Sequence, residues 1–274
     1  MTLHGLVTEQ SLQGRTMKGL LLLAFRSSMK ATGSFASAFV VHSEGMRKTA
    51  EDQYGLHDVF VIPLGSVLVS AVAGGRVSSH HVVFFGFIRP EKGLQHLIGA
   101  IGTLREKVPD IRLTIAGSVV HERERGYLRG LRERVHTEAL TDHVRFLTEF
   151  LRDEEISELM RGAAVFALPY TDQFVEVSAI VHDVAGYGVP LVCSRTPRFS
   201  ELVDGVDCLK VAPVSSEIAR AILRILSEPN LATKLGEGLL RRSQTVTWDV
   251  VAAEHLELYR QVLRLPSPAK PPPD

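Results

Sequence analysis

Short apolar runs alternate with amphipathic segments through the middle of the chain. Six such runs are predicted as strands: His81–Phe85, Ile111–Ala116, Val144–Leu147, Ala164–Leu168, Leu191–Ser194 and Cys208–Val211. After the first run, apolar residues recur every three or four positions from Leu94 to Leu104, which is typical of one face of a helix. Apolar strands separated by helices indicate βαβ units. We therefore expect an α/β fold containing a complete Rossmann-like, doubly wound parallel sheet.

This sheet domain is predicted to span residues 81–245. Its connections should be right-handed, and ligands should bind at the carboxyl ends of the strands. A smaller unit, residues 1–65, precedes it. Its pattern predicts helix, strand, helix and strand at Arg15–Thr32, Ala38–His42, Glu44–Tyr54 and Val59–Pro63. Two strands and two helices are too few for a complete doubly wound domain, so we expect a partial N-terminal α/β domain.

Residues 66–80 are rich in Ser, Gly and Val and are predicted as a linker. It contains Ala73-Gly74-Gly75-Arg76, a weak signal for a phosphate-binding loop. The proline-rich segment 266–274 is predicted as a disordered tail.

The charge balance narrows the classes of partner. Lys plus Arg and Asp plus Glu both number 31, so no broad basic field is available for nucleic acid. Any anion site must therefore be local. The only cysteines, Cys193 and Cys208, lie inside apolar runs and are predicted as buried free thiols of a cytoplasmic protein. The Met1–His4 start has no signal-peptide pattern, which agrees with that location.

One apolar run, Leu20–Phe25, is too short to span a membrane. It is flanked by the basic residues Arg15, Lys18, Arg26 and Lys30. Two interpretations fit this pattern. The segment rests on an anionic membrane surface, which would make the protein membrane-peripheral, or it is an ordinary helix covering a sheet, which the sequence favours.

The segment Gly86–Gly93 follows a predicted strand and opens a helix. Glycine lets backbone N–H groups approach a ligand, and a helix N-terminus favours an anion. Arg89 and Lys92 add two positive charges at the same place, which favours a phosphate or diphosphate ligand. The alternative is a turn with exposed basic side chains.

Two acids, Glu176 and Asp183, lie near the start of a helix predicted from Ser178. Carboxylates there can accept hydrogen bonds from sugar or ribose hydroxyls, although acids also collect at helix starts to balance the dipole. Asp183 lies beyond the first turn of an otherwise apolar helix, which favours a functional role.

Metal and nicotinamide chemistry are not indicated. The 11 histidines and two cysteines lack metal-ligand spacing, so no metal is expected. The chain has no nucleophile elbow, Walker loop or dinucleotide-binding glycine fingerprint, which disfavours a nicotinamide-dependent dehydrogenase.

Taken in order, several segments resemble family 4 glycosyltransferases of GT-B fold, over about residues 36–265. They are Phe39–Lys48, Val61–Gly65, Gly86–Gly93, Leu113–Ser118, Val144–Leu147, Val165–Tyr170, Ala185–Val192 and Glu201–Gly205. Trp248–Tyr259 resembles the final helix of the family, which crosses back to the first domain, and predicts such a helix over residues 246–265.

The resemblance implies retaining transfer of a sugar from a nucleotide diphosphate-sugar to a hydroxyl of a glycan, lipid or small molecule, without a cofactor. Lys92 matches the lysine that neutralises the diphosphate, and Asp183 matches an acid that holds the ribose. Backbone amides near Ser178 and Ala179 match a second phosphate contact. The implied donor-binding residues are Gly86, Arg89, Lys92, Phe146, Glu176, Ser178, Ala179 and Asp183; the implied catalytic residues are His4, Arg89 and Lys92.

Three departures qualify this assignment. Phe87 stands where the family has arginine, and Arg89 is predicted to substitute for it. The first acid of the family's pair aligns with Val175, one place from Glu176. His4 resembles a catalytic histidine, but the family's N-terminal domain begins well before this segment, so we expect His4 to be poorly held.

Two further interpretations therefore stay open. In one, the chain is a non-catalytic homologue that binds nucleotide. In the other, a second polypeptide or self-association through an exposed sheet edge completes the N-terminal domain.

Overall fold

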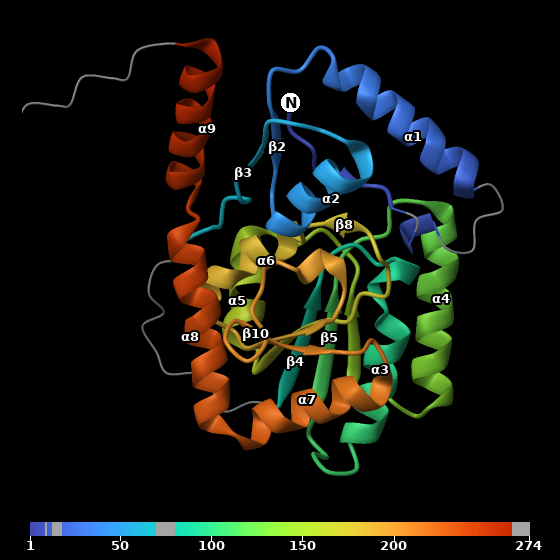
Figure 1. Cartoon of the computed structure of the whole chain (residues 1–274). Helices are drawn as coiled ribbons and strands as arrows, with labels where there is room; N and C mark the ends of the chain where they lie inside the picture. Colours follow the sequence, from blue (N-terminus) through green and yellow to red (C-terminus); the bar gives the residue numbers. More distant parts are fainter. Residues whose placement is uncertain (9, 13–17, 70–79, 265–274) are drawn as a thin grey trace, which may run out of the picture.

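The computed structural model describes residues 1–8, 10–12, 18–69 and 80–264. The predicted tail, most of the predicted linker with its Ala73–Arg76 segment, and the first residues of the predicted helix Arg15–Thr32 lie outside them. Figure 1 shows two parts, the sheet domain below and a smaller N-terminal part above, formed by the described residues before Ser66.

The sheet domain is built on six parallel strands in the order β10-β9-β7-β4-β5-β6. The strands are β4 (His81–Phe85), β5 (Arg112–Ala116), β6 (Val144–Leu147), β7 (Val165–Leu168), β9 (Leu191–Ser194) and β10 (Cys208–Val211). All six predicted strands are present, so the predicted α/β fold class is confirmed.

Both faces of this sheet are covered. Val82, Val83 and Phe84 are consecutive in β4 and point to alternate faces, yet all three are fully buried. The helices of the domain are α3 (Leu94–Leu104), α4 (Glu122–Thr137), α5 (Asp153–Arg161), α6 (Ala179–Val184), α7 (Ser215–Ser227) and α8 (Pro229–Thr245). Cys193 and Cys208 are buried free thiols, as predicted.

The strand order creates a crevice at a defined place. From β4 the chain moves outward to β5 and β6, then returns to the other side of β4 as β7. β4 and β7 are therefore neighbouring strands whose following loops lead to opposite sides of the sheet. In open α/β sheets, ligands bind at this switch point, outside the carboxyl ends of the strands.

The N-terminal part pairs β2 (Phe39–Val41) with β3 (Val59–Val61) in parallel. Its helices are α1 (Lys18–Gly33) and α2 (Glu44–Tyr54), and the side chain of Ser43 caps α2 by accepting a hydrogen bond from the backbone N–H of Met46. These elements lie close to the predicted strand, helix and strand of this region.

The first residues extend this small sheet. Thr2 forms a parallel bridge with Val40, the N–H of Leu3 donates to the carbonyl of Val40, and the N–H of Val40 donates to that of Met1, both at 2.8 Å. The expectation that His4 would be poorly held is therefore wrong. The pattern of the sequence could not reveal this pairing, because it joins residues far apart along the chain.

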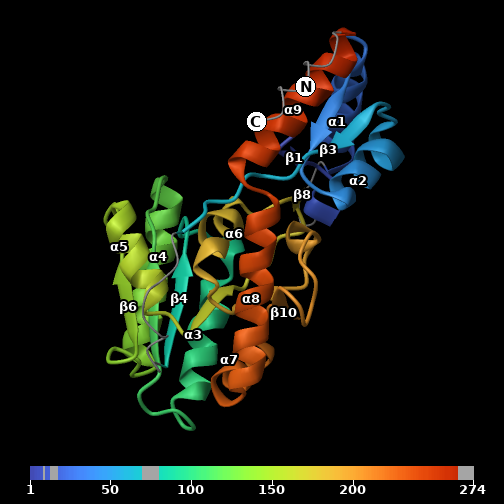
Figure 2. The ribbon, with the colours of Figure 1, turned by 90° about the vertical axis from the view of Figure 1, so that its left-hand side faces the viewer.

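The contacts that tie the two parts together include a strand pair and the packing of the last helix. β1 (Gly5–Leu6) pairs antiparallel with β8 (Val175–Glu176), which belongs to the loop after β7. The last helix, α9 (Trp248–Leu263), lies beside the N-terminal part, as both views show (Figure 1 and Figure 2). Its Val251 and Leu258 form a buried cluster with Ala38, Val40 and Ile62.

The apolar run Leu20–Phe25 lies in α1. Leu20, Leu23 and Phe25 are exposed, whereas Met29 and Gly33, near the end of the helix, contact the core of the N-terminal part. The first half of α1 therefore does not cover the sheet. Within the described part of the chain, no helix combines the length and apolarity needed to cross a membrane.

Candidate functional site

A cavity of about 570 Å³ opens between the N-terminal part and the carboxyl ends of β4 and β7. The loop after β4 lines one side, the loop after β7 and the start of α6 line another, and the loop after β6 adds a third. His4, His42 and Leu64 close it from the N-terminal part. The cavity therefore lies at the switch point of the sheet.

Close backbone packing shapes the loop after β4. A Cβ atom on Gly117 would lie 1.8 Å from the carbonyl oxygen of Gly86, and one on Gly93 would lie 2.0 Å from that of Pro169. Both glycines also have positive φ, at 149° and 67°. Glycine is thus required where the ends of β4, β5 and β7 meet, and this contact places Lys92 at the cavity.

Lys92 ends the short 3-10 turn η2 (Pro90–Lys92), and its Nζ lies 3.7 Å from the centroid of the Tyr170 ring. Within the described residues it forms no ion pair with a carboxylate. Burial lowers the pKa of Lys92 to about 8; the charge of Arg198 adds to this, and Asp172 and Glu91 oppose it. The cavity therefore contains a partly buried ammonium group without a direct counter-ion among the residues that the structure describes.

Arg198, in the short turn η4 (Pro197–Phe199), lies near the same tyrosine. Its side chain is buried and pairs with Asp172 at 2.9 Å and with Glu176, while its Cζ lies 5.3 Å from the Tyr170 ring centroid. Two carboxylates therefore neutralise Arg198, and they hold the guanidinium rigidly at the cavity wall.

Tyr170 and Ser178 complete the floor. Burial raises the pKa of Tyr170 to about 12, with the nearby Ser178 side chain and the charge of Arg198 opposing the shift. Ser178 is the N-cap residue of α6, but its side chain makes no capping hydrogen bond. The neutral tyrosine therefore packs under both cations, at the start of α6.

The opposite wall carries a histidine pair. Nε2 of His42 lies 3.0 Å from Nδ1 of His4, and Nδ1 of His42 lies 3.0 Å from the carbonyl oxygen of Ile62. His42 is buried, and burial lowers its pKa, with smaller contributions in the same direction from His4 and His255. The wall therefore presents an exposed imidazole supported by a buried one.

Most of the residues predicted from the sequence meet at this cavity. His4, Gly86, Lys92, Glu176, Ser178 and Ala179 all line it. Arg89, Phe146 and Asp183 are not among the lining residues. The Arg89 side chain instead pairs with Glu124 of α4 at 2.9 Å and lies over the ring of Phe87. Asp183 is exposed on α6, so its predicted role stays a prediction.

The lining residues that the sequence did not identify as candidates include Arg198, Tyr170 and His42. His42 is the last residue of a predicted strand, and Tyr170 and Arg198 follow the carboxyl ends of two others, which is where parallel sheets bind ligands. That rule would have identified them as candidates, but it could not show that they face one cavity.

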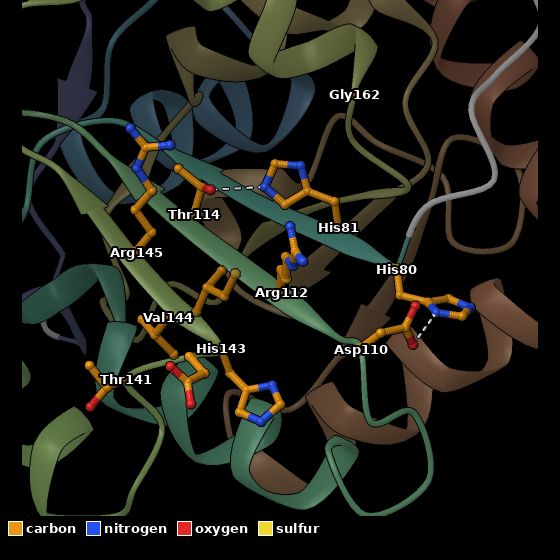
Figure 3. Close-up of a pocket in the computed structure, with 12 residues that line it drawn as sticks. His80, His81, Asp110, Arg112, Thr114, Thr141, His143, Val144, Arg145 and Gly162 are labelled. Carbon is orange, nitrogen blue, oxygen red and sulfur yellow. Dashed lines mark hydrogen bonds and ion pairs between the residues drawn. The ribbon is translucent and has the colours of Figure 1, made fainter.

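A second cavity, also of about 570 Å³, opens at the amino ends of β4, β5 and β6 (Figure 3). Two of its histidines already have partners, as Figure 3 shows: His80 bonds Asp110 at 2.7 Å, and His81 bonds Thr114 at 2.8 Å. The amino ends lie opposite the edge where ligands bind in such sheets. We therefore take the cavity at the carboxyl ends as the candidate site.

Residues 79–228 match the family model of the group 1 glycosyl transferases. The match covers more than half of the chain and includes both loops that carry Lys92 and Arg198. The chain belongs to this family. The resemblance found in the sequence is thereby confirmed, including the GT-B fold.

Two curated members of the group 1 family illustrate the relationship. The MMP alpha-(1->4)-mannosyltransferase of Mycolicibacterium hassiacum is 26% identical over 208 residues, covering 74% of this chain and 48% of that protein. The phosphatidyl-myo-inositol mannosyltransferase of Mycolicibacterium smegmatis is 27% identical over 255 residues, covering 90% of this chain and 63% of that protein. The chain thus spans less than two thirds of the length of either relative.

A solved structure with the same fold is that of HepE from Anabaena in complex with UDP. It has a TM-score of 0.79 at 20% identity, covering 95% of this chain and 71% of HepE. At this identity the likeness establishes the fold alone.

Proposed function

We propose that the chain binds a nucleotide diphosphate-sugar in the cavity between its two parts and transfers the sugar, with retention, to a hydroxyl group of an acceptor. Membership of the group 1 family supports this reaction class, and both curated relatives are named as mannosyltransferases. The HepE structure was determined with UDP, which makes uridine nucleotides the first to test.

The observation that carries the proposal is the partly buried ammonium group of Lys92, which lines the cavity without an ion-pair partner among the described residues. A buried charge without a counter-ion is unfavourable, so its retention calls for an anionic occupant of the cavity. Arg198 also lies near Tyr170, and α6 starts at the same cavity, after Ser178. The diphosphate group of a sugar nucleotide has the charge and the size to fill this position.

The same groups suit the chemistry of transfer. The bond between the sugar C1 and the diphosphate oxygen breaks, and a bond from the acceptor oxygen to C1 forms on the same face. The leaving phosphate takes the proton of the acceptor hydroxyl. Negative charge grows on the diphosphate as that bond breaks, so Lys92 stabilises the transition state more than the ground state. Asp183, exposed further along α6, is proposed to hold the ribose.

Calorimetric titration with UDP, GDP and ADP tests the donor site. We expect one nucleotide to bind, and Lys92→Met to weaken it by about 10- to 100-fold, or about 1.4–2.7 kcal/mol. Arg89→Ala is the matched control in the same loop: its guanidinium is held by Glu124 outside the cavity lining, so we expect a smaller effect. Release of nucleotide from sugar donors, followed with candidate acceptors, then tests transfer.

The outcomes separate the competing functions. A folded chain that binds none of the three nucleotides would overturn the proposed donor site. Nucleotide binding that depends on Lys92, without transfer to any acceptor, would favour the non-catalytic homologue.

A further inference from the structure

His4 and His42 end neighbouring strands of the N-terminal sheet. Thr2 and Val40 are paired residues of parallel strands, so His4 and His42, each two residues further on, come into register at the wall of the cavity. His42 is buried, whereas His4 is exposed to the cavity. The pair therefore has an inner and an outer member.

Hydrogen-bond accounting assigns the protons of the inner histidine. A backbone carbonyl can only accept, so Nδ1 of His42, 3.0 Å from the carbonyl oxygen of Ile62, must carry a hydrogen. Burial lowers the pKa of His42; His4 and His255 add to this, and the Ile62 carbonyl and Glu201 oppose it. The ring is therefore neutral at pH 7, and its Nε2 carries no hydrogen.

The same reasoning assigns the hydrogens on the ring nitrogens of the outer histidine, His4. Nε2 of His42 can only accept, and Nδ1 of His4 lies 3.0 Å away, so Nδ1 of His4 must donate. In neutral His4 the remaining nitrogen, Nε2, then carries a lone pair.

We propose that His42 is a positioning residue that fixes His4 as the Nδ1–H tautomer, so that Nε2 of His4 accepts a hydrogen bond from a hydroxyl group of the sugar or the acceptor. The inference deepens the proposed function and rests on it for the identity of the hydroxyl. The tautomer itself follows from the contacts of Ile62, His42 and His4 and from the neutral state of the buried His42 ring.

Long-range ¹H–¹⁵N correlation spectra of the imidazole groups in the full chain test the tautomer directly. We expect protonated Nδ1 and unprotonated Nε2 at both His4 and His42. His42→Gln places an amide oxygen where Nε2 stood, so we expect His4 to keep its tautomer. His42→Phe removes the acceptor, and we expect His4 to move toward the Nε2–H form.

Kinetics of the same variants test the role. We expect His42→Phe to lower kcat by about 10- to 100-fold, since partners that orient a functional histidine have effects of this size, and His42→Gln to restore most of it. Nucleotide affinity, set by Lys92 across the cavity, should stay unchanged in both, which also verifies folding.

Either of two results overturns the inference: a hydrogen on Nε2 of neutral His4 in the unmodified chain, or equal kcat for the Gln and Phe variants. If the spectra agree but the unmodified chain transfers no sugar, the proposed function fails while the tautomer assignment stands.

Discussion

Lys92 is expected to lower the stability of the ligand-free protein. The Lys92 ammonium contacts the Tyr170 ring and is disfavoured by the nearby charge of Arg198, and among the described residues it forms no ion pair with a carboxylate. Arg198, in contrast, is satisfied by Asp172 and Glu176. A partly buried charge without a counter-ion lowers stability, so we infer that Lys92 serves a ligand rather than folding.

Replacing Lys92 by Met should therefore stabilise the ligand-free protein. Met has a similar length and removes the buried charge, so we expect the free energy of unfolding to rise by about 1 kcal/mol while nucleotide affinity falls. Chemical denaturation with and without nucleotide measures both. A clear loss of stability in Lys92→Met would show that the ammonium is structural.

The pH dependence of binding should report the same ammonium. Its pKa in the ligand-free protein is about 8, and a bound diphosphate raises it, so binding takes up a proton once the pH exceeds 8. We expect nearly constant affinity up to pH 7.5 and a fall approaching tenfold per unit above about 8, where phosphate groups are already ionised. Calorimetry from pH 7 to 9.5 tests this, and Lys92→Arg, always charged, should lose the dependence.

At the scale of elements, the site depends on how closely three strand ends approach. Gly117 after β5 packs on the backbone of Gly86 after β4, and Gly93 packs on Pro169 after β7. On the other wall, β1 pairs with β8, so Gly5, the residue after His4, lies opposite Glu176. Backbone contacts between loops thus set the distance between the cations and the histidine pair.

Gly117→Ala should disrupt this packing. The added Cβ would lie 1.8 Å from the carbonyl oxygen of Gly86, at a φ of 149° that alanine avoids. We expect a loss of about 3 kcal/mol or more in the free energy of unfolding. Gly126→Ala is the control: it lies on exposed α4 with nothing within 4 Å, so a gain of about 0.5–1 kcal/mol is expected. Equal effects would contradict the packing argument.

At the scale of the molecule, a buried polar network lies where the two parts meet. Nδ1 of His182, on α6, bonds the hydroxyl of Ser66 at 3.0 Å, and its Nε2 bonds Glu201 at 3.1 Å. Glu201 also pairs with Arg242 of α8 at 3.2 Å, and the N–H of Ser66 donates to the carbonyl of Val246. The network therefore joins both chain crossings, near Ser66 and Val246, to the helix that starts at the cavity.

Glu201→Gln should weaken this connection. Burial alone would raise the pKa of Glu201, but His182 and Arg242 hold it below its usual range. Its stabilising contribution is present above about pH 4.5 and is lost as the pH falls through the lower folded-state pKa. We expect Glu201→Gln to lose about 3 kcal/mol at pH 7 and to show a smaller further loss on acidification.

Denaturation at pH 7 and pH 4 measures this difference. Glu217→Gln, which breaks an exposed pair with Arg220, is the control and should change stability by less than about 0.5 kcal/mol. If the Glu201→Gln variant were as stable as this control, the network would not contribute to holding the two parts together.

The sequence alone determined the elements and the class of the protein. All six strands of the parallel sheet, the helix from Leu94 to Leu104 and the loop that ends at Lys92 follow from patterns within a few residues, because local packing and backbone preferences create them. The order of the segments that resemble family 4 glycosyltransferases also led to the correct family.

Only the tertiary structure decided which side chains meet. Arg89 and Lys92 are close in sequence, yet Arg89 pairs with Glu124 outside the cavity lining, while Arg198 and Tyr170 join Lys92 inside it. His4 is held in place because Thr2 pairs with Val40, which lies far along the chain. Such contacts depend on how loops from separate strands approach one another, and no local pattern of apolar and polar residues contains that information.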